Sequence, residues 1–124
     1  MARIGPVDDP RPWYAAADVY VHPTFYDPCS LVSREALSCG LPLVTTCCNG
    51  VSELIQPDRE GLLLDSPRDV DGLTESLASL LDADRRATIG AAARRLAMEH
   101  PFSRNVDALL DVYQRSPRAS RHAA

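Results

Sequence analysis

Residues 22–42 read HPTFYDPCSLVSREALSCGLP, and this stretch decides the fold. It follows the β-rich run Val19–His22, which a proline closes. We predict a helix over Leu31–Cys39, because Ser30 is a suitable N-cap and Gly40 a suitable left-handed residue just past the end. The stretch therefore predicts a strand, a loop and a helix in immediate succession.

A buried strand is predicted directly after this helix. Residues Leu41–Thr46 are apolar on both faces, which is typical of a strand inside a parallel sheet. Strands that alternate with helices predict a parallel α/β sheet with right-handed crossovers. With a doubtful first strand at Met1–Val7, the set amounts to about half of a Rossmann-like domain. The other predicted elements are a short helix through Ala17, a helical turn at Val51–Ile55, a strand at Gly61–Leu64, and helices over 69–81, 84–99 and 103–113.

The composition is that of an ordinary folded protein of one domain. The chain has 124 residues, of which 45% are hydrophobic and 24% charged. A net charge of −4 argues against nucleic acid as a partner, since such proteins normally carry a basic face. The sequence shows neither a secretory pattern nor an apolar run of membrane-spanning length, so we expect a cytoplasmic location.

The basic and sulfur-containing residues exclude several classes of site. All 13 basic residues are arginine, which excludes a P-loop, Schiff-base chemistry and a phospho-receiver domain, each of which uses a lysine. The four cysteines have no C-x2-C spacing and the histidines are scattered, so we expect no metal site. We expect reduced, partly buried thiols, with Cys29 and Cys39 as packing residues.

Two acids stand eight positions apart, Asp27 in the loop and Glu35 in the predicted helix. With the surrounding string, this spacing resembles the E-x7-E motif of family 4 (group 1) retaining glycosyltransferases of the GT-B fold, here with Asp in the first place. The resemblance extends over about residues 5–113. Its other signposts are GPV at 5–7, YAAAD at 14–18, NGVSELI at 49–55, EGLL at 60–63 and the helices from Asp69 onward.

The resemblance implies a division of the chain and a partner domain. Residues 1–114 would be a partial nucleotide-sugar (donor) binding domain, the C-terminal half of a GT-B donor domain followed by C-terminal helices. Residues 115–124 would be a flexible, Arg-containing tail. The domain that reads the acceptor would lie outside this sequence.

The resemblance also implies an activity. It is transfer of a sugar from a nucleotide-diphosphate sugar, with a UDP-sugar expected, to an acceptor hydroxyl with retention of configuration. No metal and no cofactor are expected. The acceptor would be a saccharide or a lipid-linked saccharide, and the parent enzyme would associate peripherally with a membrane.

By resemblance, Asp27 and Glu35 are the catalytic pair of acids. Asp27, shorter by one methylene than the commoner Glu, would reach the hydroxyls of the transferred sugar. Glu35 would accept hydrogen bonds from the ribose hydroxyls. The free backbone N–H groups of Ser30, Leu31 and Val32 would receive the pyrophosphate, because the N-terminus of a helix favours an anion.

Three further residues complete the predicted site. Asn49 and Gly50 fall in the loop near the donor, and His22 is a secondary candidate that would contact the sugar or a catalytic group. Ordinary interpretations stay open beside these roles. Glu35 taken alone fits a solvated helix carboxylate, and Asp27 fits a turn-forming residue before a proline.

The activity also has an alternative of another class. Because the acceptor domain and the basic residues that usually hold the diphosphate are not in this sequence, the alternative is a truncated, non-catalytic remnant. A weak nucleotide-sugar-binding half-domain belongs to the same alternative.

Overall fold

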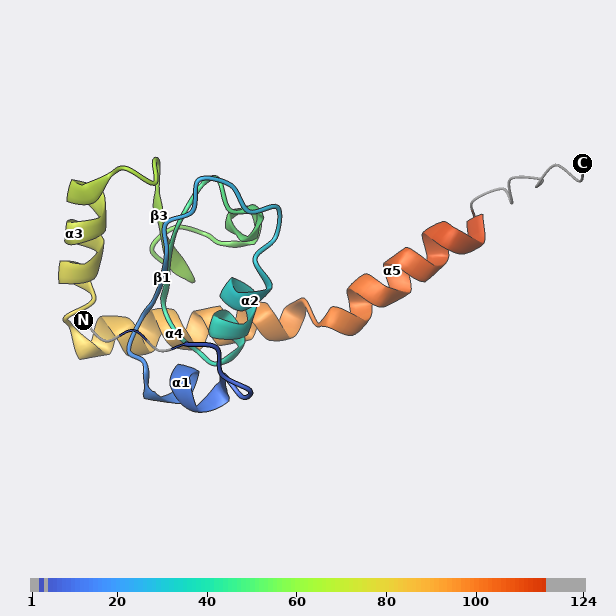
Figure 1. The fold of residues 1–124 in the computed structure, drawn as a ribbon, viewed down its shortest axis with the longest axis horizontal. Coiled ribbons are helices and arrows are strands. Elements are labelled where there is room, and N and C mark those ends of the chain that lie inside the picture. The colour runs from blue at the N-terminus through green and yellow to red at the C-terminus, as the bar shows by residue number, and fades with distance from the viewer. Residues whose placement is uncertain (1–2, 4, 116–124) are drawn as a thin grey trace, which may run out of the picture.

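The computed structural model describes residues 3 and 5–115. Figure 1 shows a small sheet with helices packed around it, and a last helix that extends away from the rest. The elements are α1 (Arg11–Ala16), β1 (Tyr20–His22), α2 (Leu31–Ser38), β2 (Leu43–Thr46), the 3₁₀ helix η1 (Gly50–Leu54), β3 (Gly61–Leu64), α3 (Val70–Ser79), α4 (Ala83–Glu99) and α5 (Phe102–Arg115).

The sheet has three parallel strands in the order β1-β2-β3. Val44 of the central strand is opposite Val21 on one side and Leu62 on the other. All four residues of β2 are buried, as expected for a strand covered on both faces. The predicted α/β class with a partial parallel sheet followed by helices is confirmed.

The predicted first strand at Met1–Val7 is wrong for the residues that the structure describes. Arg3 and Gly5–Val7 lie in no strand and are exposed. Pro6 has no N–H to donate to a neighbouring strand, and a glycine precedes it. The described sheet therefore has three strands, with β1 and β3 at its edges.

The helix α2 begins at the predicted residue and ends at Ser38, one residue before the predicted end. The Ser30 hydroxyl accepts a hydrogen bond from the Ser33 N–H at 3.2 Å, which caps the first turn. At the other end Gly40 has a φ of 78°, and the Leu41 N–H bonds the Ala36 carbonyl at 3.1 Å. That combination is a Schellman motif, which turns the chain back toward β2.

Aspartates cap the next two long helices. The Asp69 carboxylate accepts from the Gly72 N–H at 2.9 Å, and the Asp82 carboxylate accepts from the Asp84 N–H at 2.9 Å. The helix predicted from residue 84 starts at Ala83 because Asp82 is its cap.

The core lies on both sides of β2. Alternate residues of the strand point to opposite faces, so that Leu43 and Val44 enter different clusters. One cluster contains Leu37, Leu43, Val51, Ile55 and Ala93. The other contains Val44, Leu62, Leu64, Leu80 and Ile89. Helix α2 also packs closely against α4, which runs below the strands in this view (Figure 1).

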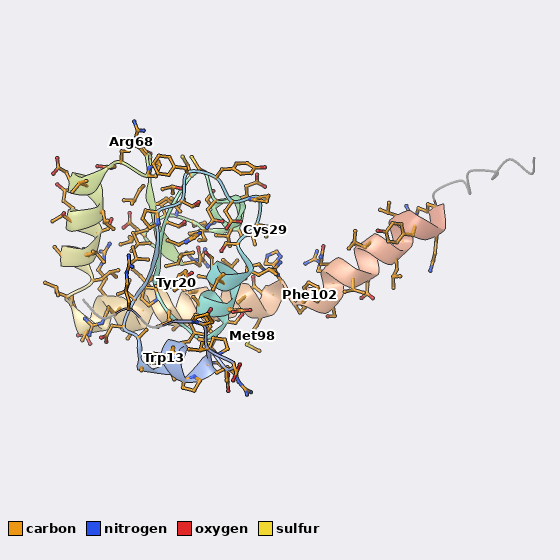
Figure 2. The ribbon with its side chains drawn as sticks, in the orientation of Figure 1. Trp13, Tyr20, Cys29, Arg68, Met98 and Phe102 are labelled. Atoms are coloured by element: carbon orange, nitrogen blue, oxygen red, sulfur yellow. The ribbon has the colours of Figure 1, made fainter. Side chains whose placement is uncertain are left out.

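The cysteines are more exposed than predicted. Cys29, Cys39 and Cys47 are exposed and free, and Cys48 is half-buried. Cys29 lies in the loop that leads into α2, as Figure 2 shows, and Cys39 is the C-cap residue directly after that helix. Both therefore lie at surface turns and are not packing residues.

Helix α5 has an apolar stripe without a covering surface in the described part of the chain. Figure 2 shows Phe102 at the point where α5 leaves the rest of the chain, and every residue of the helix is exposed. Arg115, predicted in the tail, ends this helix and pairs with Asp111 at 2.8 Å. The rest of the predicted tail, 116–124, lies outside the described residues. Within the described residues, no helix combines the length and the apolar character needed to cross a bilayer.

Candidate functional site

Two loops meet at the carboxyl ends of β1 and β2, the edge where parallel α/β sheets bind ligands. The Asp27 N–H donates to the Cys48 carbonyl at 3.2 Å, and the Gly50 N–H donates to the Asp27 carbonyl at 2.8 Å. A side chain on Gly50 would overlap the Pro28 carbonyl oxygen, so the loops touch where glycine stands. The structure thus brings Asp27, Asn49 and Gly50 together, as the prediction requires.

A buried polar network supports these loops. The hydroxyl of Thr45 donates to the His22 carbonyl at 2.8 Å, and that of Thr46 to the Thr24 carbonyl at 2.6 Å. Asn49, fully buried, donates its amide to the hydroxyls of Ser33 and Thr45 at 3.2 and 3.1 Å. The two threonines and Ser33 were not predicted as part of the site, although a Thr-Thr pair inside an apolar strand is a usable signal.

This network changes the role expected of Asn49. Its side-chain oxygen accepts from the Val51 N–H at 3.2 Å, so both ends of the amide are occupied within the protein. A buried and fully bonded amide holds its surroundings in place. Asn49 therefore supports the loop from inside the protein. Its buried side chain lies behind the surface that a sugar nucleotide would touch.

The Asp27 side chain is partly buried and has two neighbours. One carboxylate oxygen accepts from the Cys29 N–H at 3.1 Å, which is an Asx-turn. The other lies 3.5 Å from Nε2 of His22. That nitrogen is buried and has no hydrogen-bond partner among the described residues. Asp27 is thus a turn former, and it also lies beside the secondary candidate His22.

The first turn of α2 offers free donors beside Asp27. The N–H groups of Ser30, Leu31 and Val32 have no protein acceptor in the part of the chain that the structure describes. The N-terminus of a helix carries a partial positive charge, which favours an anion there. Leu31 and Val32 are exposed, so a ligand has access to this turn.

Glu35 lies one turn into α2 and is held by a residue that was not predicted as part of the site. The Tyr14 hydroxyl donates to one Glu35 carboxylate oxygen at 2.9 Å. Burial raises the pKa of Tyr14 well above its ordinary value, and the hydrogen bond to Glu35 and the charge of Glu35 raise it further. The phenol therefore stays protonated and remains a donor.

The two acids are connected by a row of aromatic rings. The Tyr14 and Tyr20 rings meet edge to face with centroids 6.2 Å apart, and the Tyr20 ring stacks on His22 at 6.2 Å. Burial raises the pKa of Tyr20, and the charges of Glu35 and Asp27 raise it further. The row thus runs from the partner of Glu35 to the neighbour of Asp27.

A groove of about 660 Å³ opens beside Glu35. It lies between α1, α2 and the junction of α4 with α5, and its walls include Tyr14, Leu31, Glu35, Leu96 and Phe102. Most of the lining is apolar, with Glu35 as one of the few charged groups. Among the described residues, no three His, Cys, Asp or Glu side chains gather as metal ligands would.

A family model described as "Glycosyl transferases group 1" matches residues 2–83. The chain belongs to the group 1 glycosyltransferases. A D-inositol 3-phosphate glycosyltransferase of Salinispora tropica is 36% identical over 107 residues, covering 86% of this chain and 22% of that protein. The chain therefore spans about a quarter of the length of the curated relatives that it matches.

Solved structures show the same fold. The sucrose-phosphate synthase of Thermosynechococcus elongatus matches with a TM-score of 0.75 and 28% identity over 82% of this chain and 26% of that chain. The Anabaena protein Alr3699/HepE, solved with UDP and glucose, matches with a TM-score of 0.73 and 22% identity over 84% of this chain and 29% of that chain. This group 1 glycosyltransferase segment thus has the fold of the corresponding part of these GT-B structures.

Proposed function

We propose that this chain supplies the donor half of a glycosyltransferase site that takes a nucleotide-diphosphate sugar. The observation that carries the proposal is the arrangement of Asp27 and Glu35 on either side of the capped first turn of α2. Asp27 lies before that turn beside the loop of Gly50, and Glu35 lies one turn after it.

The pyrophosphate would bind at the first turn of α2. The N–H groups of Ser30, Leu31 and Val32 face no protein acceptor among the described residues, and two of the three residues are exposed. Three such donors and the positive end of the helix dipole favour an anion with several acceptor oxygens, such as a diphosphate. They would also stabilise the charge on the diphosphate as it leaves, so that it needs no strong acid.

The carboxylates would bind the two ends of the donor. Glu35 is exposed and one of its oxygens has its partner Tyr14, which leaves the other oxygen for the ribose hydroxyls. Asp27 would accept from hydroxyls of the transferred sugar, with His22 beside it. Both would be charge-assisted hydrogen bonds, which are stronger than neutral ones.

The reaction would transfer the glycosyl group to an acceptor hydroxyl with retention, through an oxocarbenium-like transition state. A UDP-sugar is the first donor to test, because the solved Anabaena neighbour holds UDP and glucose. We propose that no metal or cofactor takes part. The acceptor, a saccharide or lipid-linked saccharide, would be recognised by parts of the protein outside this segment. We also propose a cytoplasmic location and, for the parent enzyme, peripheral contact with a membrane.

A second candidate is a nucleotide-sugar-binding half-site without turnover. It needs only the free N–H groups at the first turn of α2 and the two acids on either side of that turn, all of which this segment holds. The two candidates share the donor site and differ only in catalysis. Donor hydrolysis or transfer by the chain would support the first, and binding without either would support the second.

Ligand-observed NMR with UDP-, GDP- and ADP-sugars tests the donor site. Glu35→Ala should weaken binding of the preferred sugar nucleotide by about 1.5–3 kcal/mol, the usual size for a hydrogen bond to a charged group. Glu53→Ala is the matched control, because Glu53 is an exposed acid on η1. Equal binding by the wild type and Glu35→Ala, or none by the folded wild type, would contradict the proposal.

A further inference from the structure

Tyr14 connects α1 to Glu35, the proposed ribose-binding acid. Its ring is 9% exposed and packs with Ala36 and Leu41 in a small cluster of its own. Its hydroxyl reaches out of that cluster to Glu35 at 2.9 Å. The Tyr14 hydroxyl, which donates the hydrogen bond, is therefore fixed by packing. The Glu35 carboxylate, which accepts it, lies on an exposed helix face.

The hydrogen bond does more for the position of the carboxylate than for the fold. An unpaired, exposed Glu is solvated by water, so the stability gained from the hydrogen bond is offset in part by lost solvation and by the lost freedom of a flexible side chain. The main consequence of the hydrogen bond is a fixed orientation of the Glu35 carboxylate. A carboxylate has about four acceptor positions, and Tyr14 occupies one of them on Oε2. Within the described residues, the other oxygen, Oε1, has no protein donor and remains available to a ligand.

The aromatic row restrains the orientation of Tyr14. The Tyr20 ring meets Tyr14 edge to face at 6.2 Å and is itself stacked on His22. Because edge-to-face pairs have a preferred geometry, Tyr20 limits rotation of the Tyr14 ring about its own packing site. The hydroxyl is therefore held at a defined point beside Glu35.

We propose that Tyr14 is a positioning residue, whose hydroxyl holds the Glu35 carboxylate in the orientation that accepts the two ribose hydroxyls of a nucleotide diphosphate. This inference rests on the proposed function, because it gives a role to the same donor site. Its physical basis is pre-organisation, since a carboxylate already in place loses less entropy when the ligand binds.

The hydrogen bond itself is tested without any ligand. With the tyrosines labelled at ring carbon Cζ, the Tyr14 resonance should shift in Glu35→Gln and stay unchanged in Glu53→Gln. Assignment comes from the signal that disappears in Tyr14→Phe. An unchanged Tyr14 resonance in folded Glu35→Gln would overturn the inference even if Tyr14→Phe proved too unstable to study.

The positioning role is tested by removing either the hydroxyl or the ribose hydroxyls. Tyr14→Phe keeps the ring and should weaken UDP binding roughly three- to tenfold, as expected for one lost hydrogen bond. Binding of 2′,3′-dideoxy-UDP should be unchanged, because that ligand offers Glu35 nothing to accept. Tyr26→Phe is the matched control, since Tyr26 is 79% exposed.

The outcomes separate this inference from the proposed function. A ribose-selective loss supports the positioning role. Equal loss for both ligands, or none, overturns the positioning role and leaves the donor site standing. Failure of the folded wild-type chain to bind UDP contradicts the proposed function and overturns the positioning role with it, and a Tyr14 signal that responds to Glu35→Gln would then report a structural contact.

Discussion

The Gly50 N–H donates to the Asp27 carbonyl at 2.8 Å and thereby joins the loops that follow two neighbouring strands. The bond is possible because Gly50 lies directly against the Pro28 carbonyl, with no room for a Cβ. The position of Asp27 therefore depends on a residue 23 positions later in the chain.

Gly50→Ala tests this contact between the loops. The new methyl group would overlap the Pro28 carbonyl oxygen, so the loops must separate. We expect a loss of about 1–3 kcal/mol in the free energy of unfolding, as for overpacking elsewhere. Urea denaturation measures it. Gly5→Ala is the control, because nothing lies within 4 Å of the added atom, and equal effects from the two variants would contradict the prediction.

Asn49→Ala tests the buried network behind the loops. The variant removes the amide that serves Ser33, Thr45 and Val51 and leaves buried partners unsatisfied. We expect a loss of about 1–3 kcal/mol in unfolding free energy. Asn105→Ala, on the exposed helix α5, should change it by less than about 0.5 kcal/mol. A similar small change at Asn49 would show that the network does not stabilise the site.

Helix α5 is expected to add little to the stability of the described domain. Leu109 and Leu110 are 47% and 50% exposed, whereas Leu37 is 2% exposed and belongs to the core. Leu37→Ala should cost about 2–5 kcal/mol of unfolding free energy. Leu109→Ala should cost less than about 0.5 kcal/mol. A large cost at Leu109 would mean that its face packs against the domain in solution.

The local parts of the fold could be predicted from the sequence. Ser30 and Gly40 bound α2 correctly, because capping depends on residues within one turn of the helix end. The apolar run of β2 was also sufficient to predict a buried strand, since a strand buried on both faces has little room for polar side chains. The first predicted strand, Met1–Val7, was wrong for its described residues, because a short apolar run does not reveal whether a partner strand is in reach.

The site could be predicted only in outline. The sequence placed Asp27 and Glu35 on either side of a helix start, which is local information. It did not reveal that Tyr14, 21 positions before Glu35, bonds that acid. Nor did it show that Asn49 is buried, because burial of a polar residue depends on partners from several elements. Contacts between residues far apart in the sequence could not be predicted from sequence pattern and spacing.

Alkaline pH should destabilise the chain in part through Tyr14. Its pKa is raised above the ordinary value of 10.0, by burial first and then by Glu35. A raised pKa in the folded state means that Tyr14 keeps its proton up to a higher pH in the native state than in the unfolded state. The contribution of Tyr14 to the free energy of unfolding is therefore complete below about pH 10 and is lost as the pH rises above that value. Denaturation between pH 8 and about 11 should show a smaller decline in Tyr14→Phe than in the wild type, with Tyr26→Phe declining as the wild type does. Identical declines in Tyr14→Phe and the wild type would contradict this origin.

Asp27→Ala should affect recognition of the sugar and leave recognition of the nucleotide largely intact. Asp27 lies before the helix N-terminus, whereas Glu35 lies one turn after it, so the two acids would meet opposite ends of the donor. We expect the variant to bind the sugar nucleotide and the bare nucleotide with nearly equal affinity, while Glu35→Ala weakens both. Asp27→Ala also removes the Asx-turn, in which the Cys29 N–H donates to the Asp27 carboxylate. Asp27→Asn keeps an acceptor for that N–H and removes only the charge, so it distinguishes the effect of the turn from the effect of the charge. Calorimetry with UDP and UDP-glucose measures both affinities. If Asp27→Asn still discriminates as the wild type does, the charge of Asp27 has no part in binding the sugar.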